Sequence, residues 1–290
     1  MEFTASVIES TSSKHGEGAL WDVRTNRLLW VDIDGCRVNR FDPKTGKNES
    51  VEVASAVGTV VRRKQGNDEV IAAIKTGCAA VDMGTGKATM LTPMDLGGVR
   101  FNDGKCDPAG RFWVGTMAPR GTAVLYRVDA DLSVRPMVPG VSTSNGIVWS
   151  KDCRTMYYID TPTGMVEAFD YDNASGAIAN RRCAVKVAAE LGHPDGMTID
   201  DQDRLWVAMW GGARVCCFDP KTAALLHTVH TPGARHSSAC ALGGEGMAEL
   251  FITTSTQGIK PEDRAGQPNA GKLFRCNVPA KGLAAYEFAG

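Results

Sequence analysis

The sequence lacks the features that mark several large classes of protein. No apolar run approaches the roughly 20 residues that a membrane-spanning helix requires. Lysine plus arginine number 32 and aspartate plus glutamate 33, for a net charge of −1, so there is no basic footprint for nucleic acid and no electrostatic membrane anchor. The N-terminus carries an early acid and no apolar core segment, which disfavours a signal peptide. These absences predict a cytoplasmic protein with no nucleic-acid partner and no membrane partner.

The cysteines show neither a disulfide framework nor a zinc clip. There are nine of them, an odd number, and no two have CxxC spacing. Cys216 and Cys217 are adjacent, and adjacent residues on a strand point to opposite faces. We therefore expect reduced thiols that fill core positions.

What the chain does have is a short repeat of two or three large apolar residues beside a charged turn. The copies are residues 28–32, 69–73, 111–115, 155–159, 204–208 and 249–253, at intervals of 41, 42, 44, 49 and 45 residues. Short strands separated by turns at this period are typical of β-propeller blades, and no long stretch shows helical periodicity. We predict an all-β, six-bladed β-propeller formed by residues 1–290 as one domain; the alternative is a pair of β-sandwiches.

A second β-like segment follows each copy. These segments are residues 37–42, 77–82, 123–128, 165–170, 214–219 and 271–276, and turn residues often come after them. A propeller must also join its first and last blades, so that no strand edge is left open at this junction, the seam. We expect residues 3–9 to pair with residues 283–288 inside one blade, because this closes the ring and removes two open edges.

Polar residues recur at nearly one register, about ten residues before the aromatic strands. They are Glu17, Asn102, Asn145 and Asp195, whereas the other two repeats carry Gly58 and Ser238. One register of different blades forms a ring around the axis, so these far-separated side chains should meet there. Their oxygens suit a hard cation such as Ca²⁺, Mg²⁺ or Mn²⁺, and two carboxylates would repel each other without one. Taken singly, however, each Asn-Gly or Asp-Gly also reads as a turn.

Longer motifs around these residues resemble the SMP-30, gluconolactonase and luciferin-regenerating-enzyme family, over almost the whole chain. The motifs are residues 100–111 with 115–118, 144–146 with 149–150, 157–160, 169–172, 194–197 with 199–200, 205–208, 281–286 and 289–290. The resemblance implies a six-bladed propeller with one axial divalent metal ion, held by Glu17, Asn145 and Asp195. It also implies substrate contacts from Arg100 and Asn102, and a second role for Asp195 as the general base. We expect Ca²⁺ first, with Zn²⁺, Mg²⁺ or Mn²⁺ as alternatives.

One departure from the family pattern concerns the substrate. Members that hydrolyse sugar lactones often have a glutamate soon after the Gly-Thr-Met-Ala motif, here residues 115–118. This chain has Pro119 and Arg120 at that place, followed by a shortened loop, Gly121-Thr122. A carboxylate for sugar hydroxyls is therefore missing or comes from elsewhere, which leaves the exact sugar open more than the reaction class.

The expected function is metal-dependent hydrolysis of a sugar lactone, an aldonolactone, to its aldonic acid. Two alternatives stay open: a phosphotriesterase-like hydrolase on the same axial metal, and a non-catalytic calcium-binding propeller. Arg100 and Asn102 favour catalysis, because cation binding alone does not need them. The partner that the sequence indicates is a small-molecule lactone, and we expect a monomer or a weak homodimer.

The remaining conspicuous residues are mostly expected to be structural. Blade-core positions are predicted for Trp21, Trp30, Trp113, Trp149 and Trp206. Trp210 and Met117 are candidates for the mouth of the site, with packing as the alternative. His193 is expected to be a loop residue, and Asp103 a turn residue that supports Asn102.

Overall fold

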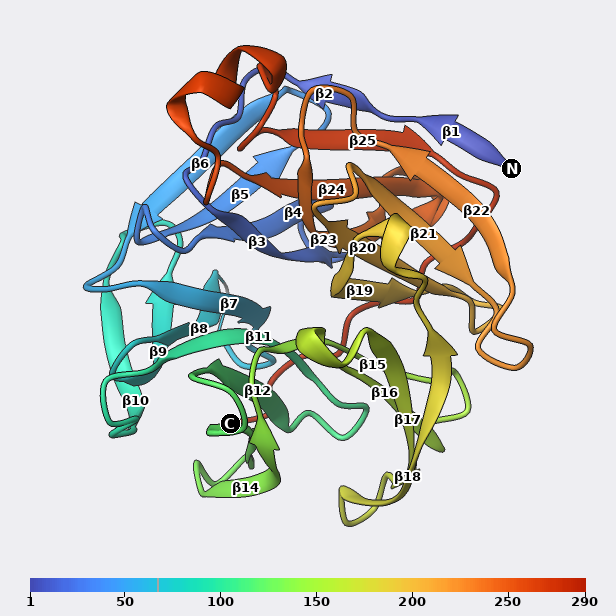
Figure 1. The fold of residues 1–290 in the computed structure, drawn as a ribbon. Coiled ribbons are helices and arrows are strands. Elements are labelled where there is room, and N and C mark those ends of the chain that lie inside the picture. The colour runs from blue at the N-terminus through green and yellow to red at the C-terminus, as the bar shows by residue number, and fades with distance from the viewer. Residues whose placement is uncertain (67) are drawn as a thin grey trace.

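The computed structural model describes residues 1–66 and 68–290 and confirms an all-β, six-bladed propeller (Figure 1). Five blades contain four strands each, and the sheet that ends at β19 has a fifth. The first three blades are β3 (Gly16–Asp22), β4 (Arg27–Asp32), β5 (Arg37–Asp42), β6 (Lys47–Glu52); β7 (Val57–Arg62), β8 (Glu69–Ile74), β9 (Gly77–Asp82), β10 (Ala88–Pro93); and β11 (Arg100–Cys106), β12 (Phe112–Met117), β13 (Ala123–Val128), β14 (Val134–Val141).

The other three blades complete the ring. They are β15 (Ser144–Trp149), β16 (Thr155–Asp160), β17 (Met165–Asp172), β18 (Ala177–Lys186); β19 (His193–Ile199), β20 (Leu205–Trp210), β21 (Arg214–Phe218), β22 (Leu225–His230), β1 (Glu2–Thr4); and β23 (His236–Gly243), β24 (Glu249–Ser255), β25 (Leu273–Asn277), β2 (Ser6–Ile8). Each innermost strand packs against the innermost strand of the next blade, and β23 closes on β3. Four 3₁₀ turns lie in the connections, at Thr161–Thr163, Ala189–Leu191, Glu245–Met247 and Pro261–Gly266.

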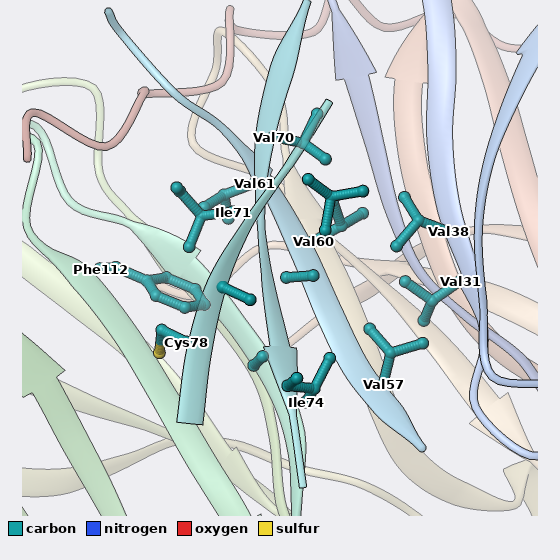
Figure 2. Packing of buried hydrophobic residues seen from close by; sticks show 14 of the residues in the cluster. Val31, Val38, Val57, Val60, Val61, Val70, Ile71, Ile74, Cys78 and Phe112 are labelled. Atoms are coloured by element: carbon teal, nitrogen blue, oxygen red, sulfur yellow. The ribbon is translucent and has the colours of Figure 1, made fainter. Parts of the chain in front are cut away.

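The predicted strands follow the repeat because the two middle strands of each blade are buried on both faces. β8 and β20 are buried at nearly every position, as continuous apolar runs require. Figure 2 shows side chains from neighbouring blades meeting in one cluster, with Val31 and Val38 on one side, Val60 and Ile71 in the middle and Phe112 on the other. Burying each such side chain contributes about 1.5–3 kcal/mol. The five tryptophans assigned to the core are at most 4 % exposed.

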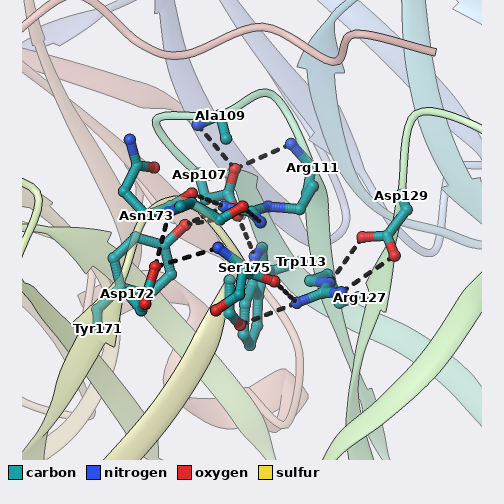
Figure 3. A network of polar contacts seen from close by, with 12 residues as sticks. Asp107, Ala109, Arg111, Trp113, Arg127, Asp129, Tyr171, Asp172, Asn173 and Ser175 are labelled. Atoms are coloured by element: carbon teal, nitrogen blue, oxygen red, sulfur yellow. Dashed lines mark hydrogen bonds and ion pairs between the residues drawn. The ribbon is translucent and has the colours of Figure 1, made fainter.

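Polar contacts that include the turn between the first two strands of a blade tie neighbouring blades together. The carboxylate of Asp107 is fully buried and accepts hydrogen bonds from Arg111 Nε at 2.6 Å, Trp113 Nε1 at 2.8 Å and Tyr171 OH at 2.7 Å (Figure 3). Tyr171 belongs to the next blade, so this carboxylate joins two sheets. Asp200, Arg204 and Trp206 repeat the first part of the arrangement two blades later. The spacing Asp-x-x-x-Arg-x-Trp is therefore a structural element of the repeat.

The predicted seam is wrong. Ser6–Ile8 forms the outer strand of the last blade by pairing antiparallel with β25, and Glu2–Thr4 pairs parallel with β22 of the blade before it. The C-terminal segment instead crosses beneath the ring, where Phe288 N donates to Arg62 O and Ala289 N donates to Gly110 O. In Figure 1 the C-terminus accordingly lies beside the third blade, away from the N-terminus. The segment cannot continue the last blade, because the open edge of β25 is already taken by β2.

The fold is stabilised by packing of its core, without disulfide bonds among the described residues. All nine cysteines are free, and Cys216 and Cys217 are buried in separate parts of the core. Within the described residues, none of the helical turns has the length and apolar character needed to span a bilayer.

Candidate active site

The predicted polar residues lie where the innermost strands leave regular pairing. The register between the first and second strand of a blade shifts across Glu17–Leu20, Phe101–Gly104, Ser144–Ile147 and Pro194–Met197. A bulge of this kind interrupts the ladder and redirects a side chain. Because the same interruption recurs from blade to blade, Glu17, Asn102, Asn145 and Asp195 all turn toward the axis.

The glycines that follow Asn145 and Asp195 are explained by close contact between neighbouring blades. A Cβ atom on Gly146 would lie 2.8 Å from the backbone oxygen of Asp195, and one on Gly196 would lie 2.8 Å from the Cα atom of Ala239. Real Cβ atoms do not approach backbone this closely, so a side chain at either position would push adjacent innermost strands apart. Glycine here keeps the ring narrow enough for side chains of different blades to meet.

The predicted residues share one pocket of about 210 Å³ at the mouth of the axis. Glu17, Arg100, Asn102, Asn145 and Asp195 all line it. Glu17 and Asp195 are each 5 % exposed and Asn145 is 3 % exposed, whereas Arg100 is half-buried. The residues come from four of the six blades. Residues as far apart in the sequence as Glu17 and Asp195, which are separated by 178 positions, thus line a single cavity.

The electrostatics of this pocket favour a cation. Burial, together with the charge of nearby Asp103, raises the pKa of Glu17 to about 8. Burial also raises the pKa of Asp195 well above its ordinary value, and the charges of Glu17 and Asp103 add to that effect. Two buried carboxylates cannot both stay charged without compensation. A divalent cation would supply it, since two carboxylates with an amide oxygen are the hard donors that such ions prefer.

The amide of Asn145 could join the two carboxylates as a third oxygen donor. Among the described residues, no three His, Cys, Asp or Glu side chains gather closely enough to hold a metal ion. A cation held in this pocket would therefore use a donor of another kind beside the two carboxylates. Asn145 offers its Oδ1, which already accepts a hydrogen bond from Asn102 Nδ2 at 2.7 Å and keeps a second lone pair.

A chain of hydrogen bonds holds these groups in place across three blades. Arg100 donates to Asn102 Oδ1 at 2.6 Å, and Asn102 donates in turn to Asn145. Asn145 Nδ2 donates to Thr161 Oγ1 at 2.6 Å, and this hydroxyl donates to Pro194 O at 2.8 Å, next to Asp195. Both amide hydrogens of Asn102 are used within the protein, since Nδ2 also donates to Ser144 O at 2.8 Å. Asn102 thus fixes both Arg100 and Asn145.

A profile of the SMP-30/gluconolactonase/LRE-like region matches residues 15–256. The chain belongs to this family. A relative named putative sugar lactone lactonase YvrE, from Bacillus subtilis, is 39% identical over 280 residues, covering 95% of each chain. Regucalcin of Danio rerio is 40% identical over 282 residues, again covering 95% of each chain. A luciferin-regenerating enzyme has a solved structure that superposes with a TM-score of 0.90 at 26% identity, covering 98% of this chain and 99% of its own.

The position where the sequence departs from the family pattern is not among the described residues that line the pocket. Pro119 and Arg120 are exposed, and the loop closes on itself, because Thr122 N donates to Pro119 O at 3.0 Å. Among the described residues, the carboxylates that line the pocket are those of Glu17 and Asp195. No further carboxylate in the lining replaces the missing one.

Of the other residues that the sequence pointed to near the site, some line the pocket and some do not. Trp210 and Met117 do line the pocket, and Met117 is 42 % exposed. His193 is exposed at the start of β19 and is not among the lining residues. Asp103 is buried beside the site. One of its oxygens accepts from Gly104 N at 2.7 Å, and the other has no partner in the described structure.

Sequence reasoning missed four residues that line the pocket: His15, Thr143, Thr161 and Gln257. His15 lies in an isolated bridge just before β3, two positions before Glu17, so the period-2 alternation of extended chain, which places such residues on one face, was a usable signal. The other three lie at strand ends or in connections, where the repeat has no fixed register. Nothing in their residue types marked them.

Proposed function

We propose that this protein hydrolyses a sugar lactone to the corresponding aldonic acid and that it requires a divalent cation, Ca²⁺ in the first place, held by Glu17, Asn145 and Asp195. The observation that carries the proposal is the convergence of these buried oxygens with Arg100 on one pocket. Membership of the family and the relative named a lactonase support the reaction class. Oxygen donors accept several cations, so Zn²⁺, Mg²⁺ and Mn²⁺ remain alternatives to be tested.

The chain's own residues perform the proton transfer and the orientation. Asp195 accepts a proton from the attacking water, a contribution of about 10²–10⁴-fold in rate. Arg100 is fixed by its bonds to Asn102 Oδ1 and to Phe101 O at 2.9 Å, and its remaining N–H groups orient the lactone in the pocket. When bound, a divalent cation supplies Lewis-acid stabilisation of the oxyanion and lowers the pKa of water.

The reaction is balanced without any further reactant. The water oxygen forms a bond to the carbonyl carbon, and the ring C–O bond breaks. The released ring oxygen takes up a proton and becomes a hydroxyl group, while the new carboxylic acid ionises at neutral pH. Asp195 returns the proton that it accepted, so the protein is unchanged after each turnover.

The test is pH-stat hydrolysis of D-glucono-1,5-lactone after chelation with EDTA and re-addition of Ca²⁺, Zn²⁺, Mg²⁺ or Mn²⁺ in turn. We expect chelation to abolish turnover and at least one cation to restore it. A homoserine lactone and paraoxon, assayed in parallel, separate lactone hydrolysis from phosphotriester hydrolysis. Cation-independent turnover, or no turnover of any lactone with every cation, would falsify the proposal.

A further inference from the structure

An aromatic cluster lies at the pocket, beside the strand that carries Asp195. Trp210, the last residue of β20, lines the pocket and is half-buried. His236 of the neighbouring blade stacks on one face of the indole, with ring centroids 4.2 Å apart and planes at 21°. His15 approaches it from the first blade, with centroids 5.6 Å apart and planes at 52°. Two other blades thus hold this side chain in one orientation.

The same strand carries a second tryptophan–histidine stack that serves only the core. Trp206 is fully buried and stacks on His227, with centroids 5.8 Å apart and planes at 16°. Its indole N–H donates to Asp200 at 2.9 Å. Neither ring lines the pocket. The two stacks are alike in chemistry and differ in location, so packing alone does not require an aromatic ring at the mouth of the site.

The rest of the lining is largely polar, and His15, Arg100, Thr143, Thr161 and Gln257 offer hydrogen bonds to sugar hydroxyls. Among the described residues, Glu17 and Asp195 are the carboxylates of the lining, and the proposed function assigns both to the cation. Asn102 Oδ1 already accepts a hydrogen bond from Arg100. The C–H groups of a lactone ring need a surface of a different kind. Aromatic faces carry negative charge density and attract such groups.

From this arrangement we infer that Trp210 is the platform on which the lactone ring lies, and that His236 is the positioning residue that keeps the indole flat against the substrate. The inference rests on the proposed lactonase function and names its substrate class: cyclic lactones with C–H groups exposed on one ring face. Met117 also lines the pocket beside Arg100 and provides a second apolar surface; its Sδ lies 3.2 Å from the guanidinium. Recognition then depends on ring shape more than on a carboxylate contact to hydroxyls.

The experiment measures kcat and KM for D-glucono-1,5-lactone with the wild-type protein and two variants of the platform. Trp210→Ala should raise KM about tenfold and change kcat less than about threefold, because stacking contributes to binding in the ground state and the transition state alike. Trp210→Phe retains an aromatic face and should stay within about threefold of the wild-type KM. Calorimetry should show unchanged cation affinity in both variants.

The matched control compares the two histidines. His236→Ala should raise KM about threefold, whereas His227→Ala, which removes the equivalent stack in the core, should leave KM unchanged. Thermal unfolding of each variant shows that it is folded. If the wild-type protein turns over the lactone but Trp210→Ala leaves KM unchanged, the platform is refuted and the lactonase proposal stands. If the wild-type protein hydrolyses no lactone with any cation, the lactonase proposal fails, and the platform falls with it.

Discussion

Thr161 connects the proposed ligand Asn145 to the strand that carries Asp195, so its hydroxyl tests the whole arrangement. Its Oγ1 accepts from Asn145 Nδ2 at 2.6 Å and donates to Pro194 O at 2.8 Å, both in a partly buried setting. The substitution Thr161→Val keeps the branched shape and removes the hydroxyl. It leaves an amide N–H and a backbone carbonyl without this partner, and it frees the Asn145 side chain to rotate.

Two magnitudes follow from these contacts. Each lost hydrogen bond reduces stability by about 1 kcal/mol, so the variant should lose about 2 kcal/mol of unfolding free energy. Removing a partner that orients a metal ligand typically weakens metal binding about 10–100-fold. We therefore expect calorimetric titration with Ca²⁺ to show a Kd at least about tenfold higher in Thr161→Val than in the wild-type protein.

Thr161→Ser is the matched control, because serine keeps the hydroxyl and loses only the methyl group. It should bind Ca²⁺ within about threefold of the wild-type protein. Urea unfolding in EDTA measures the loss of stability separately from the cation. If Thr161→Val bound Ca²⁺ as tightly as Thr161→Ser, Asn145 would not need this anchor, and the ligand assignment would be refuted.

Four further predictions address the base, the substrate contact, the fold and pH. Asp195→Ala should abolish lactone turnover and weaken cation binding; near-normal turnover would contradict its role. Arg100→Ala should raise KM more than it harms cation affinity, and calorimetry showing lost affinity would overturn that assignment. Asp107→Ala leaves a buried arginine without its carboxylate and should cost about 3 kcal/mol or more in urea unfolding, so a loss below about 1 kcal/mol would show that the network contributes little. Burial lowers the pKa of His236 from 6.5 to about 4, so as the pH falls the unfolded chain binds a proton at this imidazole before the folded protein does, and stability decreases below pH 6.5. Thermal unfolding of His236→Gln should therefore show a smaller decrease in stability over this pH range. An identical pH profile in the two proteins would refute the buried, neutral state of His236.

The sequence repeat predicted the blades because the residue pattern that forms a blade lies within one short stretch of the chain. Each blade needs middle strands that are apolar on both faces and turns between them, and both leave a signal at a fixed period. The meeting of the polar side chains in one pocket was predictable for the same reason. Glu17, Asn145 and Asp195 occupy one register of the innermost strands, and a propeller places equal registers around one axis.

The seam and the outer parts of the site were not predictable in this way. Residues 2–8 are two short strands that pair with different blades, one parallel and one antiparallel. Such short segments pair with whichever edge lies open in the folded ring, and no sequence pattern marks that edge. Thr161 and Gln257 lie outside the strands of the repeat, so their approach to the pocket depends on the path of connections that the period does not fix.

The two ring positions without a charged or amide side chain explain how a repeated fold makes an asymmetric site. A Cβ atom on Gly58 would lie 2.4 Å from the backbone oxygen of Asn102, so glycine there lets the neighbouring blade close up beside Arg100 and Asn102. Ser238 donates its hydroxyl to the backbone oxygen of Gly16 and fixes the strand next to Glu17. These two blades therefore support the proposed functional residues, while three others carry the proposed oxygen ligands. Because a cation needs only a few ligands from the protein and a lactone needs room beside it, replacing either small residue by a larger one should damage the site by displacing the neighbouring strand, without removing any ligand.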